Sequence, residues 1–182
     1  HVSGTIIGKF RISGQNRTKG SNITMQQSPQ TVQQDSDGSM SRIRERLREL
    51  LWQEQLPNRA EALRLTEQLI PGDLPDTLCW PDIPYMDVSR NVWRAAAHYI
   101  RLREAIIAGG EQRLSTDPEW RALLFAVLRY WLLHDYRNPN WWHNDIGMPK
   151  NLSDIGILLL PFLPQELFGR LCELVGRGSM KT

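Results

Sequence analysis

Cysteine is scarce in this sequence, with Cys79 and Cys172 the only two among 182 residues. Two cysteines are too few for a disulfide-based scaffold, and their spacing matches no metal-binding motif. A bond between them across the fold is one alternative. Two free and buried thiols are the prediction we prefer, because unpaired cysteine behaves as a small apolar residue.

Long apolar runs and an excess of one charge are also missing. The longest apolar run, IGILLLPFL, contains Pro161 and is far shorter than the roughly 18 residues that cross a bilayer. We therefore expect no membrane span. The 22 Lys and Arg against 20 Asp and Glu give a formal charge of +2. This balance argues against a nucleic-acid-coating protein and leaves room for a local basic cleft.

The common signatures of enzyme chemistry are absent as well. The sequence contains no glycine-rich phosphate loop, no HExxH, no Cys/His cluster and no GxSxG. We therefore expect neither a metal nor a cofactor, and these motifs identify no catalytic residue. No secretory signal is visible. Because the sequence begins at His1 rather than at Met, this absence gives no information about export.

Residues 1–39 differ in composition from the rest of the chain. TIIGKFRISG, from Thr5 to Gly14, alternates well enough to form one short strand. The stretch after it is rich in Gln, Ser and Asn, and it has too few apolar residues to offset the entropy lost on ordering. We predict a mostly disordered leader or linker over 1–39 and a folded domain over 40–182.

From Met40 onward the apolar residues recur at helical spacing. Ser41 is the predicted cap of the first helix, Pro71-Gly72 stop the second, and Gly109-Gly110 close the third. Thr116 or Asp117 is the predicted cap of the fourth. The domain is therefore predicted to be all-α, with no strand after residue 40 and about six helices, over 41–55, 59–70, 90–110, 115–136, 152–160 and 164–175.

Trp141 and Trp142 stand side by side in RNPNWWHNDIG, which has the composition of a polar loop. Burying both is unfavourable, because a buried loop leaves backbone polar groups without partners. An exposed indole suits the apolar face of a sugar ring, while polar neighbours bond its hydroxyls. Internal packing of the tryptophans is the alternative, and the pattern alone does not decide between them.

Polar and titratable residues near this pair are weaker candidates. His143 and Asn144 are candidates for substrate contact, whereas Asp145 more readily closes a turn. His98 and His134 fall within or at the end of predicted helices, where histidines usually pack or bond the helix end.

A second unusual loop, CWPDIPYMDVSR, offers two interpretations. Trp80 and Tyr85 are candidates for a second aromatic wall. The interpretation we prefer is structural: Asp87 or Ser89 caps the next helix, and Arg90 pairs with a carboxylate.

Three segments together resemble a known family. NPNWWHNDIGMPKNLSDIGILL is similar to the Asn-Trp-Trp…Ile-Gly-x-Pro signature of polysaccharide lyase family 8, which includes hyaluronate, chondroitin AC and xanthan lyases. WPDIPYMDVSRNVWRAAAHYIRL and DPEWRALLFAVLRYWLLHD resemble further segments of the family in the expected order. The likeness covers roughly Ile43 to Thr182 and leaves out residues 1–39.

The resemblance implies an incomplete (α/α) toroid of paired helices around a cleft that binds an acidic polysaccharide. In such a domain the tandem tryptophans form an aromatic patch. The implied substrate-binding residues are Trp141, Trp142, Asn140, His143 and Asn144. It also implies secretion or a periplasmic location.

The implied reaction is a metal-independent β-elimination. An Asn neutralises the carboxylate of a uronate, and a Tyr, assisted by His and Arg, removes the C5 proton. In the family these residues follow the Trp-Trp helices, so we expect none of them here and a lyase fragment without activity of its own. Two alternatives stay open: a non-catalytic carbohydrate-binding module and a purely structural helical domain. Half a toroid would expose apolar faces, so we expect self-association or binding of a hydrophobic dye.

Overall fold

The computed structural model describes the backbone of residues 29–178 and the side chains of residues 38–178. The chain divides into two units, His1–Asp37 and Gly38–Thr182, and the second holds the elements discussed below apart from the first residues of the first helix. The strand predicted at Thr5–Gly14 lies outside the described residues, as does the predicted leader up to residue 28. Both stay predictions.

The first helix, α1 (Pro29–Trp52), begins well before the predicted start. The cap predicted at Ser41 is wrong, because Ser41 lies inside the helix, and residues 29–39 of the predicted linker are helical. Polar composition indicates the lack of a buried face but does not oppose helical backbone, since Gln and Met are good helix formers. The side chains of residues 38–47 are indeed all exposed.

The second helix, α2 (Arg59–Thr66), is shorter than predicted, and two strands follow it. Oδ1 of Asn58 caps α2 by accepting the Glu61 N–H at 3.0 Å. Strands β1 (Ile70–Pro71) and β2 (Leu78–Cys79) pair antiparallel, with Ile70 opposite Cys79. The prediction of no strand after residue 40 was therefore wrong. Strands of two residues are too short to produce an alternating pattern.

The longest helix of the folded unit beyond α1 is α3 (Ala97–Thr116), which follows a 3₁₀ turn, η1 (Arg94–Ala96). The predicted stop at Gly109-Gly110 is half right. The backbone leaves the helical region at Gly110, where φ is 80°, and then resumes it as far as Thr116. Glycine adopts this φ at low cost, so the break depends on Gly110.

The next helix, α4 (Pro118–His134), starts as predicted. Of the two candidate caps, Asp117 is the right one, because its Oδ1 accepts the Trp120 N–H at 2.9 Å. Pro118 occupies the first turn, where its missing N–H costs nothing.

The Trp-Trp segment is helical, which corrects the predicted loop. Helical backbone begins at Trp141 and continues through a π-helical turn, η2 (His143–Gly147), into α5 (Met148–Leu159). The helix predicted to begin near Leu152 therefore begins much earlier. The last helix, α6 (Gln165–Gly176), lies almost where predicted.

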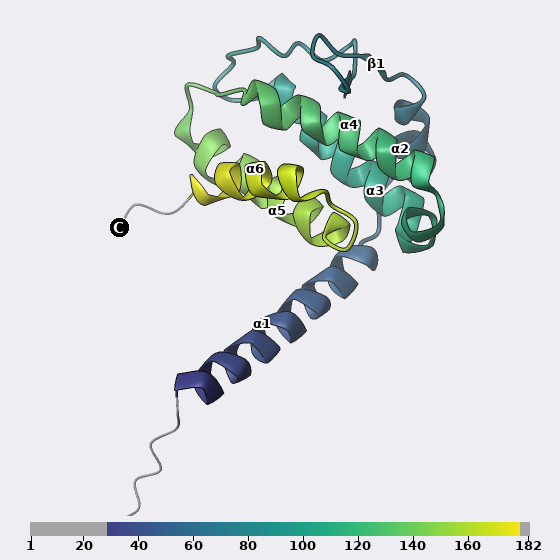
Figure 1. Ribbon diagram of the computed structural model, residues 1–182. Coiled ribbons are helices and arrows are strands. Elements are labelled where there is room, and N and C mark those ends of the chain that lie inside the picture. The colour runs from purple at the N-terminus through teal and green to yellow at the C-terminus, as the bar shows by residue number, and fades with distance from the viewer. Residues whose placement is uncertain (1–28, 179–182) are drawn as a thin grey trace, which may run out of the picture. The chain divides into compact units, whose positions relative to one another are not determined.

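The described unit is all-α apart from the short hairpin. Helix α3 packs against α2, α4 and α5, while α6 packs against α4 and α5 (Figure 1). Four of the seven tryptophans lie in the core: Trp80, Trp93, Trp120 and Trp131. Among the described helices none is both long and apolar enough to cross a membrane. The predicted toroid arrangement stays a prediction.

The two cysteines are free, as preferred above, and differ in exposure. Cys79 is buried, and this burial raises the pKa of its thiol. Cys172 is exposed, so its predicted burial was wrong.

Candidate functional site

Among the residues whose side chains the structure describes, Trp141 and Trp142 are the exposed large aromatic residues. The exposed fraction is 63% for Trp141 and 47% for Trp142, whereas the four core tryptophans are 4% exposed or less. Leaving two indoles in water while burying four others forfeits a large apolar contribution to folding. The alternative that both pack internally is excluded by these exposures.

Asn140 positions the start of the helix that carries the two indoles. Its Oδ1 accepts the Trp142 N–H at 3.1 Å, and its backbone carbonyl accepts the His143 N–H at 3.2 Å. This is the bonding of a helix N-cap. Its Nδ2–H donates to the Arg90 carbonyl at 2.9 Å, which ties the helix start to the distant segment around Arg90.

Asn138, which the sequence analysis missed, is the centre of a polar hub at this helix start. It is only 4% exposed. Its Nδ2–H donates to the Ser89 carbonyl at 3.0 Å, and its Oδ1 accepts the Asn140 N–H at 2.8 Å. Asn144 closes the hub, because its Oδ1 accepts the Asn138 N–H at 2.9 Å and its Nδ2–H donates to the Asn138 carbonyl at 2.7 Å. The three asparagines at 138, 140 and 144 were the available signal, since Asn favours side-chain bonds to nearby backbone.

The structure thus brings the predicted site residues together, but they differ in exposure and in hydrogen bonding. His143 is 8% exposed, and its Nε2–H donates to the Arg90 carbonyl at 3.3 Å. Both amide atoms of Asn144 are bonded to Asn138. Both amide atoms of Asn140 are likewise bonded within the protein, to the Trp142 N–H and the Arg90 carbonyl. Substrate contact by Asn140, Trp141, Trp142, His143 and Asn144 stays a prediction, and the exposed faces of the two tryptophans are the best suited to it. Asp145, predicted to close a turn, lies instead within the π-helical turn.

The segment that faces this helix start is shaped by Asp87. Its Oδ2 accepts the Arg94 N–H at 2.8 Å, and its Oδ1 accepts the Ser89 hydroxyl at 2.7 Å. The bond from Ser89, followed by those from Arg94, lowers the pKa of Asp87. The N-caps are Trp93 for η1 and Ala96 for α3, so the preferred interpretation of Asp87 or Ser89 as the helix cap was wrong. The Asp87 carboxylate instead bonds the first N–H of η1 from seven residues away, and it pairs with Arg94 at 3.2 Å rather than with Arg90.

The second aromatic wall of Trp80 and Tyr85, the less favoured interpretation of this loop, is not formed. Trp80 is 1% exposed, and its Nε1–H donates to the Leu65 carbonyl at 2.8 Å. The ring packs edge-on against His98 of α3, with centroids 5.2 Å apart. Tyr85 is half-buried, and its hydroxyl is bonded to the Trp80 N–H and to His98. This burial raises the pKa of Tyr85.

His98 is a packing histidine, as predicted, and is fully buried. Its Nε2–H donates to the Val127 carbonyl at 2.9 Å, so in the neutral ring Nδ1 accepts from the Tyr85 hydroxyl at 2.9 Å. Burial lowers the pKa of His98 to about 3. His134 ends α4, bonded through Nδ1 to the Tyr130 carbonyl and through Nε2 to Asp73.

The described residues offer no group of three or more His, Cys, Asp or Glu side chains that could hold a metal ion. Charges of both signs lie near the tryptophans: Asp145 follows Trp142 by three residues, and Arg137 precedes Trp141 by four. Arg90, whose carbonyl is bonded to Asn140 and His143, is exposed, and the described residues give it no ion pair. Arg137 is 49% exposed and lies 4.0 Å from Asp135.

Replacing Asn138 with alanine is expected to cost about 1–3 kcal/mol of unfolding free energy. The change removes the bonds of the buried Asn138 amide to the Ser89 carbonyl and the Asn140 N–H, and each such bond contributes about 0.5–1.5 kcal/mol net. Chemical denaturation measures the loss. The control is Asn91→Ala, at an exposed asparagine of the facing segment, where a shift within about 0.5 kcal/mol is expected. Equal losses in both variants would contradict the hub.

Comparisons with known proteins agree with this fold. Residues 60–179 match the family described as polysaccharide lyase family 8, N-terminal alpha-helical domain. Chondroitinase-AC of Pedobacter heparinus is 30% identical over 105 residues, which cover 55% of this chain and 15% of that protein. A solved structure of chondroitinase AC lyase superposes with a TM-score of 0.63 at 28% identity, over 74% of this chain and 20% of that one.

These matches extend over the helices that carry and support the two tryptophans. The family match begins in α2 and includes α3 to α6, the polar hub and the Trp-Trp segment. The chain spans less than a quarter of the length of either relative. On the evidence of its sequence match and its fold, the chain belongs to polysaccharide lyase family 8, and residues 60–179 correspond to the N-terminal α-helical domain of that family.

Proposed function

We propose that this chain is part of a polysaccharide lyase that acts on a uronate-containing glycan, and that it supplies the aromatic sugar-binding surface. The observation that carries the proposal is the exposure of Trp141 and Trp142 on a helix start that a polar hub holds in place. Two indoles anchored in this way are stacking platforms that lose little conformational entropy when a ring binds.

Two exposed arginines near the pair support an acidic glycan. The backbone carbonyl of Arg90 is bonded to Asn140 and His143, so this exposed arginine is part of the segment next to the helix start that carries the indoles. Arg137 is a second exposed cation on the chain segment leading to the pair. Guanidinium groups bond carboxylates and sulfates in a bidentate manner. A glycan with alternating uronates meets both requirements: apolar ring faces and negative charge.

The reaction we propose for the whole protein is β-elimination, with this chain contributing binding. Proton removal needs a base that reaches the substrate. Of the described histidines, His98 is buried, His134 is bonded to Tyr130 and Asp73, and the Nε2–H of His143 is used by Arg90. These bonds support the proposal that this chain contributes binding rather than proton transfer. We propose that the protein is exported, since its substrate class is extracellular.

Fluorescence titration with a chondroitin oligosaccharide tests the proposal. A uronate-containing chain stacked on Trp141 and Trp142 should shift or quench the tryptophan emission. The effect should weaken as salt is added, because charge attraction contributes. Dextran, a neutral glycan, is the control and should leave the emission unchanged. An emission spectrum indifferent to chondroitin at low salt would overturn the proposed binding.

A second candidate function is that of a carbohydrate-binding module without catalytic activity. The hydrogen bonds that His98, His134 and His143 make within the protein favour this candidate. Ultraviolet absorbance of an unsaturated uronate product separates the two functions. Product formation by the longest protein that contains these residues supports the lyase, whereas binding without product supports the module.

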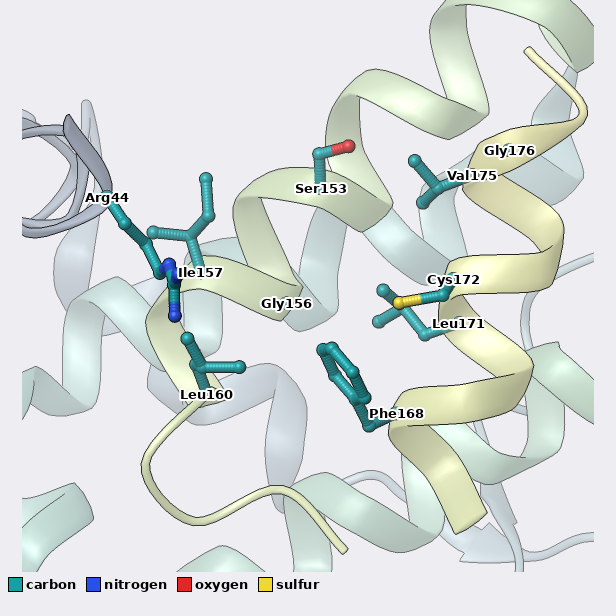
Figure 2. A pocket seen from close by; sticks show the side chains of 10 residues that line it. All are labelled: Arg44, Ser153, Gly156, Ile157, Leu160, Phe168, Leu171, Cys172, Val175 and Gly176. Carbon is teal, nitrogen blue, oxygen red and sulfur yellow. The ribbon is translucent and has the colours of Figure 1, made fainter. Parts of the chain in front are cut away.

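We further propose that the chain associates with a second copy through apolar helix faces. Helices α5 and α6 line an open groove of about 510 Å³, with Ile157 and Leu160 facing Phe168, Leu171 and Val175 (Figure 2). On α1 an apolar stripe lies in water, with exposed fractions of 59%, 51%, 44% and 49% for Met40, Ile43, Leu47 and Leu50. Exposed apolar surface of this kind drives association.

Replacing Leu47 with glutamate is expected to lower the average mass in sedimentation toward that of a monomer. The carboxylate interrupts the apolar stripe without touching the core, so the melting temperature should change little. Gln53→Glu, which adds the same charge at an exposed position beyond the helix, is the matched control. A wild-type chain that sediments as a monomer and binds no hydrophobic dye would exclude self-association.

A further inference from the structure

Gly147 is the last residue of the π-helical turn and has no conformational need to be glycine. Its φ and ψ are −63° and −52°, values that every residue adopts in a helix. Glycine is a poor choice in such a position, because it loses more backbone entropy on folding than alanine does. The reason for glycine at position 147 must therefore be steric: a side chain there would occupy space that another group fills.

That space is filled by the indole of Trp142. A Cβ added to Gly147 would lie 2.9 Å from Cζ3 of Trp142, and 3.4 Å from both Cε3 and Cη2. All three atoms belong to the six-membered ring, which therefore lies directly against the Gly147 backbone. Contacts below 3.0 Å require the ring to move, so only glycine permits this placement.

The π-helical turn creates this contact. The Met148 N–H donates to the His143 carbonyl, which is the i to i+5 bonding of a π-helix. Five residues also separate Trp142 from Gly147, so the wide turn brings the indole of one over the backbone of the other. The His143 ring stands edge-on to the indole, with centroids 5.3 Å apart at 85°. One face of Trp142 is thus covered by its own helix, and 47% of the residue stays exposed.

We infer that Gly147 is a positioning residue for sugar binding. It lets the Trp142 indole lie flat on the π-helical turn, so that the opposite face is presented to a pyranose ring. A side chain at 147 lifts the six-membered ring and turns the stacking face away. The inference rests on the proposed function for its binding consequence, while the position of the ring is a property of the free protein.

The test compares Gly147→Ala with Gly169→Ala. Gly169 is an exposed glycine inside α6 whose added Cβ would have no neighbour within 4 Å, so it controls for helix propensity. In the ¹H–¹⁵N NMR spectrum of the free chain, the indole N–H peak of Trp142 is identified by its loss in Trp142→Phe. This peak should shift in Gly147→Ala and stay in place in Gly169→Ala. An unmoved peak in both variants overturns the inference, whatever the chain binds.

A double-mutant cycle with the chondroitin oligosaccharide then tests the consequence for binding. Gly147→Ala should weaken binding by the same factor as Trp142→Ala, and should have no further effect when Trp142 is already alanine. An equal loss in the wild-type and Trp142→Ala backgrounds would show that Gly147 does not act through Trp142. If the wild-type chain binds no chondroitin, the proposed function fails, and the indole shift alone decides whether Gly147 places the ring.

Discussion

Replacing both Trp141 and Trp142 with alanine is expected to abolish measurable binding of the chondroitin oligosaccharide. A pyranose that covers half of an indole removes on the order of 80 Å² from water, which at about 25 cal/mol per Å² is about 2 kcal/mol. Each loss corresponds to about thirtyfold in Kd, and the two together to about a thousandfold if they add. Isothermal titration calorimetry measures both single variants and the double variant.

The fold should survive this change, because neither side chain belongs to the buried core: Trp141 is 63% exposed, and Trp142 rests on its own π-helical turn. Thermal melting of the double variant is therefore expected to match that of the wild type within a few degrees. Replacement by phenylalanine at both positions is the conservative comparison: it keeps an aromatic face and should retain intermediate affinity. An alanine double variant that binds like the wild type would falsify the aromatic surface.

Acid is expected to destabilise the folded unit through His98. The pKa of His98 is lowered from 6.5 to about 3 by burial, so between these values the unfolded chain binds a proton that the folded chain does not. The unfolding free energy is unaffected by His98 above pH 6.5 and falls by about 1.4 kcal/mol per pH unit as the pH drops toward 3. Between pH 8 and pH 4.5 the loss amounts to about 3 kcal/mol.

Urea denaturation at several pH values measures this loss. His98→Gln keeps one donor and one acceptor toward Val127 and Tyr85 but does not titrate. The variant should be less stable at pH 8, because its fit is imperfect, yet lose much less stability between pH 6.5 and pH 5. This window lies above the ordinary pKa of Asp and Glu, so carboxylates contribute little. The same pH slope in both proteins would show that His98 is not the cause.

Local signals in the sequence correctly predicted the start of α4 and the break in α3. Asp117 caps α4 with a bond to the Trp120 N–H three residues away, and Gly110 breaks α3 through its own backbone angle. Such features depend on interactions within one turn, which a short window contains. Ser41 was misassigned because a polar helix without a buried face has no apolar periodicity to mark its start.

Contacts between residues far apart in the sequence could not be predicted from such local signals. Nothing near Asn138 in sequence announces that its amide will bond the Ser89 carbonyl, 49 residues away. From the sequence, Trp80 was a candidate for an exposed aromatic wall. In the structure its indole N–H donates to the Leu65 carbonyl, and the ring is buried. In each case the partner is a backbone group on another element, and local propensity carries no information about it.

For the tandem tryptophans, the sequence by itself determined their identity, their place before a helical segment and their likeness to a lyase signature. The tertiary structure alone decided that both indoles are exposed, that Asn140 and Asn138 hold their helix start, and that Gly147 lies beneath Trp142. The physical reason is that exposure and ring orientation depend on which surfaces the rest of the fold covers. A local stretch of sequence does not show which of its surfaces the rest of the fold will cover.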